Sequence, residues 1–87
     1  PFGSLVELGI IKPGTTIFDN KKKISAKIRA DGSIKHAQTE GSIHKVAATI
    51  LGAESCNGWT YWYFKLGSSF VPIDNLRQKF LVDKSYL

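Results

Sequence analysis

The sequence predicts a small α+β domain: a curved antiparallel sheet of four to five strands, one main amphipathic helix packed on it, and short helices at the ends. Apolar and polar residues alternate strictly over 24–29, which is typical of a strand with one buried face. Hairpin turn signals stand at residues 19–20 and 31–32. One apolar stripe at helical spacing runs over 43–51. A chain of 87 residues suits one domain, so we expect residues 1–87 to fold as a single unit.

The first third of the chain is predicted to form a short helix and a three-stranded meander. Ser4 and Glu7 have the spacing of a capping box, which predicts a helix of under two turns with Leu5 and Leu8 as its apolar positions. Strands follow at 15–18, 24–29 and 33–37, because turn residues separate these runs.

Three consecutive lysines, Lys21, Lys22 and Lys23, lie at or next to the first hairpin turn. They form either a solvated hairpin tip or a clamp for phosphate groups. The first interpretation is the more common for a charge run, so we do not include them in the site.

The main helix is predicted to begin after Ser42, a natural N-cap, and to end at Gly52. Its apolar residues recur at i, i+3, i+4, i+7 and i+8, as expected for a helix with one buried face. They are Ile43, Val46, Ala47, Ile50 and Leu51.

The first turn of this helix carries His44 and Lys45, where acids are usually preferred. Each exposed cation there costs about 0.3–1 kcal/mol against the helix macrodipole. Helix N–H groups, a hydroxyl and cations together can hold an anion such as a phosphate oxygen. Alternatively, Ser42 is simply a cap and the other two are ordinary surface residues. The residues alone leave both interpretations open.

An aromatic stretch at 56–65 is predicted to form a strand over 59–65. Asn57 and Gly58 precede it as a turn, and the Asn57 amide is either a turn former or a reader of base edges. Large aromatics fall on both faces, so one face is expected to meet a partner. One face has Trp59, Tyr61, Tyr63 and Lys65, and the other has Thr60, Trp62, Phe64 and Leu66.

The chain is predicted to close with a turn at 67–69, a short return strand at 70–71 and a third helix with Asp74 as its N-cap. Arg77, in the first turn of that helix, either meets a ligand or pairs with Asp74 at the surface. The residues expected to face inward are Ile73, Leu76 and Phe80.

Composition favours a binding module over an independent enzyme. Twelve Lys and Arg against seven Asp and Glu give a net charge of +5, which favours a polyanionic partner. One cysteine and two histidines exclude an internal disulfide and a zinc set, and fit a reducing, cytoplasmic setting. Neither a signal peptide nor an apolar run of ~18 residues is present, so no membrane association is expected. His36 and His44 are expected to be surface or cap residues and not catalysts, and Cys56 a small buried apolar residue. The start at Pro1 suggests a piece of a longer protein.

Five motifs occur together: PFG at 1–3, ADGSI at 30–34, GSIHK at 41–45, CNGWTYW at 56–62 and PID at 72–74. With them, nearly the whole chain resembles the C-terminal domain of the bacterial cell-cycle-regulated DNA adenine methyltransferases, of the restriction-enzyme and adenine-methylase-associated domain family. In such enzymes an S-adenosylmethionine-dependent catalytic domain comes first and methylates adenine N6 in GANTC sites. Its Asp-Pro-Pro-Tyr and Phe-x-Gly-x-Gly motifs are absent here. The resemblance implies a double-stranded DNA-binding fragment that holds no cofactor, belonging to a nucleoid-associated enzyme.

The resemblance also implies DNA-contacting roles for Ser42, Asn57, Trp59 and Arg77, and it favours the anion-site interpretation of Ser42. Trp59 is then expected to point outward, and Trp62 and Phe64 inward. Our hypothesis from the sequence is that Lys45 and Arg77 hold phosphates with the helix start, beside His44. Trp59 stacks on an unpaired or distorted base.

The alternative is a protein-interaction module, or a homodimer, formed through the exposed aromatic face. The two functions differ in their response to salt, because phosphate contacts weaken as salt rises and an apolar interface hardly does.

Overall fold

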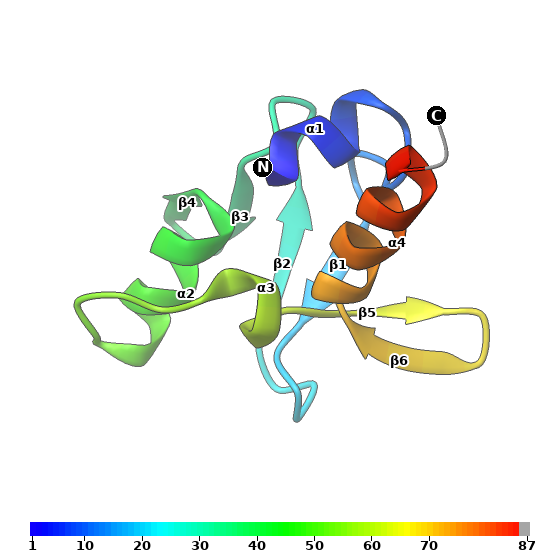
Figure 1. Ribbon diagram of the computed structural model, residues 1–87. Coiled ribbons are helices and arrows are strands. Elements are labelled where there is room, and N and C mark those ends of the chain that lie inside the picture. The colour runs from blue at the N-terminus through cyan, green and yellow to red at the C-terminus, as the bar shows by residue number, and fades with distance from the viewer. Residues whose placement is uncertain (86–87) are drawn as a thin grey trace.

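The computed structural model describes the backbone of residues 1–85 and the side chains of residues 1–79. That part of the chain contains four helices and six strands (Figure 1). They are α1 (Phe2–Glu7), β1 (Thr16–Phe18), β2 (Ser25–Ile28), β3 (Ile34–His36), β4 (Thr39–Gly41), α2 (Ile43–Leu51), α3 (Gly58–Tyr61), β5 (Tyr63–Leu66), β6 (Ser69–Pro72) and α4 (Asp74–Ser85).

The strands form one antiparallel sheet in the order β4-β3-β2-β1-β5-β6, which confirms the predicted α+β class. The expected four to five strands are too few, because β4 was missed. β3 and β4 are joined by two residues, and Ala37 takes the left-handed conformation with φ of 52°. Tight hairpins need such a conformation, and Gly or Asn usually supplies it. An alanine at this place gives no turn signal in the sequence.

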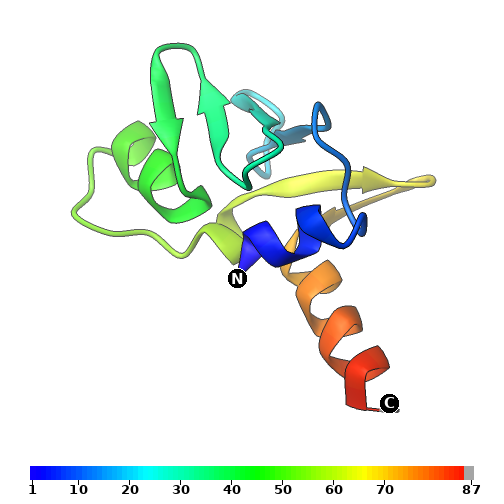
Figure 2. The same cartoon turned by 90° about the horizontal axis from the view of Figure 1, so that it is seen from above.

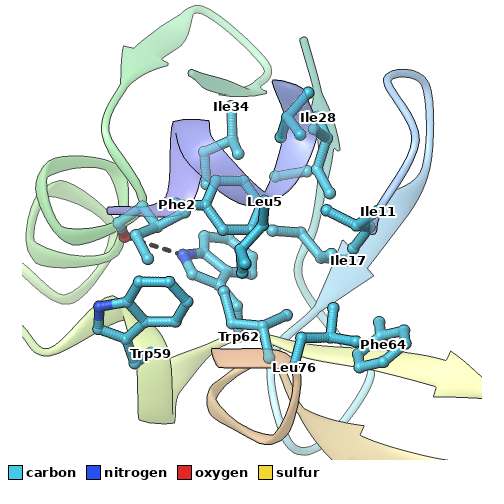
Figure 3. Packing of buried hydrophobic residues seen from close by; sticks show 14 of the residues in the cluster. Phe2, Leu5, Ile11, Ile17, Ile28, Ile34, Trp59, Trp62, Phe64 and Leu76 are labelled. Carbon is cyan, nitrogen blue, oxygen red and sulfur yellow. Dashed lines mark hydrogen bonds between the residues drawn. The ribbon is translucent and has the colours of Figure 1, made fainter. Parts of the chain in front are cut away.

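The helices of the described residues lie on one side of the sheet, and none of them covers its other side (Figure 2). The core lies between the helices and the sheet, and Trp62 is fully buried within it (Figure 3). The indole Nε1–H of Trp62 donates a 2.9 Å hydrogen bond to the backbone carbonyl of Ile43. This bond links Trp62, which directly precedes β5, to the first turn of α2.

The first helix begins earlier than the capping-box pattern predicts. α1 starts at Phe2 with Pro1 as its N-cap, and no side chain caps it. Phe2, Leu5 and Val6 are buried, so the phase of the helix follows their burial and not the spacing of polar residues. Leu8, expected on the apolar side, is 60% exposed.

The main helix is as predicted. Ser42 is the N-cap of α2, and Gly52 ends the helix in the left-handed conformation with φ of 67°. Ile43, Val46 and Ala47 are buried along the stripe, whereas Leu51 at the end is 58% exposed.

The aromatic stretch is wrongly predicted in its first half. Residues 58–61 form the helical turn α3, and β5 begins only at Tyr63. The Asn57 side chain accepts a hydrogen bond from the N–H of Trp59, which starts a helical turn in place of a strand. Trp62 and Phe64 point inward as expected.

The C-terminal helix packs its first turn on the core. Asp74 is its first residue and not the residue before it, while Ile73 and Leu76 are buried as predicted. The expected inward position of Phe80 lies outside the described side chains.

Candidate nucleic-acid interface

The first turns of α2 and α3 meet at backbone contact. The N–H of Gly58 donates a 2.9 Å hydrogen bond to Nδ1 of His44. A Cβ at Gly58 would lie 2.5 Å from the carbonyl carbon of Ile43, so a larger residue cannot occupy this position without a backbone shift. The chain thus brings together two short segments that are 14 residues apart in sequence.

The N-terminus of α2 carries a side-chain cap and lies beside a pocket. The Ser42 hydroxyl accepts a 3.0 Å hydrogen bond from the N–H of Lys45, so Ser42 caps the helix. No acid stands in the first turn. Ser42, His44 and Lys45 are exposed and line a pocket of about 360 Å³, closed by residues 53–56. Lys45 is the cation of this pocket, and Glu54 is its acid.

The hydrogen bond from Gly58 determines how His44 presents its ring. Because Nδ1 accepts an N–H, the neutral imidazole carries its proton on Nε2. His44 therefore offers an N–H donor on the exposed side of α2, next to the helix start.

Asn57 serves as the cap of α3. Its Oδ1 accepts the 3.0 Å hydrogen bond from the N–H of Trp59, which answers the question left open by the sequence in favour of the capping role for this oxygen. Asn57 is exposed, and its amide NH₂ is the remaining donor group of the side chain.

Trp59 does not point outward, contrary to the sequence-based expectation. It is 7% exposed. The ring of Phe2 packs edge-on against it at 5.9 Å between centroids, and the Arg77 guanidinium lies 4.6 Å from the ring centroid on a face (Figure 3 shows Phe2 and Trp59). The helical turn α3, in place of the expected strand, places this indole among α1 and α4. Trp59 also lines a second pocket of about 210 Å³ with Ser42 and His44.

The sequence left open whether Arg77 pairs with Asp74 at the surface or meets a ligand, and its geometry is compatible with both. Its Nη2 lies 2.6 Å from Oδ1 of Asp74, as expected for a surface pair one turn apart. Its side chain remains 38% exposed while it covers Trp59. The guanidinium is therefore fixed in place and still accessible at the surface.

The six predicted site residues belong to one region of the molecule. Ser42, His44 and Trp59 share a pocket, Lys45 adjoins it, Asn57 caps the helix that carries Trp59, and Arg77 stacks on that ring.

Two residues that support the site were not predicted as part of it. Phe2 fixes Trp59 from α1, and Gly58 allows the contact between α2 and α3. The motifs PFG and CNGWTYW contain these residues, but no spacing in the sequence indicates that they meet.

Among the residues that the structure describes, no three His, Cys, Asp or Glu side chains gather in a way that could hold a metal ion. His36 is structural, because its Nδ1 donates a 2.7 Å hydrogen bond to the Ser25 carbonyl. Cys56 is half-buried at the pocket wall. Burial raises the pKa of the Tyr61 hydroxyl, which therefore stays neutral.

In the described part of the chain no helix is both long and apolar enough to cross a bilayer.

The chain is similar to proteins of a known family. The family model described as "Restriction Enzyme Adenine Methylase Associated", or RAMA, matches residues 1–85. The chain belongs to the RAMA family. A curated relative, the "Type II methyltransferase M.HinfI" of Haemophilus influenzae, is 31% identical over 80 residues. These residues are 92% of this RAMA chain and 22% of the relative, so the chain spans about a fifth of the length of that methyltransferase.

Proposed function

We propose that this RAMA domain binds double-stranded DNA for an adenine-N6 methyltransferase and helps it to recognise GANTC sites. The observation that carries the proposal is the convergence of the α2 start, the α3 cap and Arg77 on one surface. A net charge of +5 and a methyltransferase relative support a DNA partner.

The start of α2 is proposed to hold a backbone phosphate. N–H groups in a first helical turn have no partner within the helix and carry the positive end of the macrodipole. Lys45 adds a positive charge, and Nε2–H of His44 adds a directed donor. These groups recognise phosphate of any sequence, so they set affinity and position.

Asn57 and Arg77 are proposed to supply the polar contacts beyond that phosphate. The Asn57 amide donates from the α3 cap, and the Arg77 guanidinium donates from the face of Trp59. Since Trp59 is buried, its role in this proposal is to position Arg77 and not to stack on a base. This arrangement replaces the outward tryptophan expected from the sequence.

The parent enzyme is proposed to resemble the cell-cycle-regulated bacterial methyltransferases. S-adenosylmethionine would then bind the catalytic domain of that chain, and the RAMA domain would contact that domain and the distorted DNA beside the target adenine. Such an enzyme works at the bacterial nucleoid in the cytoplasm.

The test is fluorescence anisotropy of a labelled GANTC duplex and of a scrambled duplex, titrated with the domain at two salt concentrations. We expect affinity to fall with log salt by about 0.9 per neutralised phosphate. Lys45→Ala should weaken binding to both duplexes alike and reduce the salt slope by about one phosphate. Lys12→Ala is the matched control, because Lys12 is exposed in the connection between α1 and β1.

Absence of binding at low salt by a folded domain would overturn the proposal. Salt-indifferent association of the domain with itself, measured by light scattering on the same samples, would favour the alternative of a protein-interaction or homodimer module. One member of the aromatic face on which that alternative was based, Trp59, is buried in α3.

A further inference from the structure

The uncovered side of the sheet carries a basic surface. Strand register places the side chains of Thr16, Lys27 and Lys35 in one row across β1, β2 and β3, on the side away from buried Ala26 and Ile28. Glu40 continues the row on β4, where its carboxylate is shared by Lys35 at 3.6 Å and by Arg29. We call this side of the sheet the open face.

Three aromatic rings continue the open face across β1, β5 and β6. Phe18 pairs with Tyr63, and Lys65 pairs with Phe70. Tyr63 and Phe70 stack at 5.3 Å with an interplanar angle of 16°, and Phe18 lies 6.1 Å from Phe70. All three rings are half-buried, and the described helices lie on the other side of the sheet (Figure 2).

A pocket of about 220 Å³ lies at the edge of these rings. Phe18 and Phe70 supply apolar surface, Lys22 and Lys65 supply two ammonium groups, and Ser68 and Ser69 supply hydroxyls. Apolar ring surface beside cations and hydroxyls suits a nucleotide, whose base is flat and whose phosphate is an anion.

Lys22 is held in this pocket by the fold of the β1–β2 turn. It has a left-handed backbone with φ of 59°, and its Nζ lies 4.5 Å from the centroid of Phe70. The Asp19 carboxylate accepts hydrogen bonds from the N–H groups of Lys23 and Ile24, so it is used to form the turn. Lys22, the middle residue of the lysine run, is therefore part of this surface.

We propose that the open face, with the pocket lined by Phe18, Lys22, Lys65 and Phe70, binds an unpaired nucleic-acid strand. A duplex exposes mainly phosphates to a sheet surface, and the half-buried rings would meet no apolar partner there. An unpaired strand offers both bases for the rings and phosphates for the lysines. This surface lies on the opposite side of the sheet from α2 and α3, so the inference does not rest on the proposed duplex site.

The test is anisotropy of a labelled oligothymidylate of about ten nucleotides, a length within the usual range for single-strand sites. The double variant Lys22→Glu with Lys65→Glu should weaken binding by about tenfold, which corresponds to about 1.4 kcal/mol. Phe70→Leu should weaken oligothymidylate binding severalfold, because leucine keeps an apolar side chain but removes the aromatic ring. The matched control is Lys12→Glu, which changes one exposed charge outside the pocket, and circular dichroism checks that each variant is folded.

The results for the oligothymidylate test the open face, and the results for the duplex test the proposed site at α2 and α3. If the wild-type domain does not bind the oligothymidylate at low salt, or if the double variant binds it as well as Lys12→Glu does, the open face is not a single-strand site. Lys45→Ala should weaken duplex binding, and it should reduce oligothymidylate binding less than the double variant does. If the wild-type domain binds the oligothymidylate but not the duplex, the proposed function is overturned and this inference is not.

Discussion

The N–H of Gly58 donates a hydrogen bond to Nδ1 of His44 at 2.9 Å, and this bond ties the cap of α3 to the first turn of α2. The contact is possible because position 58 has no side chain. It sets the tautomer of His44 and the place of Asn57 at once.

We predict that Gly58→Ala destabilises the domain by about 1–3 kcal/mol, the usual cost of an overpacked buried site. The added Cβ would lie 2.5 Å from the carbonyl carbon and 2.6 Å from the carbonyl oxygen of Ile43, which are backbone atoms. Urea unfolding measures the change. Gly52→Ala is the control, since a Cβ there meets open space and costs only the strain of a positive φ. Equal losses of stability in the two variants would contradict the close approach.

Trp59→Ala is predicted to unfold the domain or to cost about 3–5 kcal/mol, as expected for a buried tryptophan. This reverses the outcome expected for an outward Trp59. Thermal melting followed by circular dichroism gives the change in stability. Leu66→Ala, at an apolar residue that is 52% exposed, should change stability by less than about 0.5 kcal/mol. If Trp59→Ala is as stable as Leu66→Ala, the Trp59 side chain points outward and is not part of the core.

Ser42 allows its capping role to be separated from phosphate binding. Ser42→Ala should cost about 1 kcal/mol, because the N–H of Lys45 loses its acceptor. Ser42→Asp should keep the cap and the stability, since Asp is a good N-cap. Its negative charge should nevertheless weaken duplex binding severalfold by repelling a phosphate. If Ser42→Asp binds DNA like the wild type, no phosphate lies at this helix start.

Stability should fall at acid pH in part through Asp31. The hydroxyl and N–H of Ser33 donate to its carboxylate at 2.6 and 2.9 Å, and these bonds lower the pKa of Asp31 below its ordinary value of 3.8. A lowered folded-state pKa means that this contribution is complete above pH 3.8 and is lost as the pH falls through the folded-state value. Asp31→Asn should therefore flatten the acid limb of a melting-temperature profile. An unchanged acid limb would show that other groups control it.

The pattern of residues was sufficient for elements whose evidence is local. The alternation over 24–29 determines β2, and the stripe from Ile43 with Ser42 and Gly52 at its ends determines α2. These predictions depend only on neighbours one to four residues away. The motifs were likewise sufficient for the RAMA family.

Tertiary contacts decided the rest. Trp59 is buried because Phe2 and Arg77, which are distant in sequence, enclose its ring. β4 forms because β3 offers it a partner across a turn with Ala37 in a conformation that alanine rarely adopts. The sequence by itself determined the class of the fold, the main helix and the family. Only the packing of distant segments decided which aromatic residues are buried and which lie on the open face, because the energy of burial depends on neighbours that no local pattern specifies.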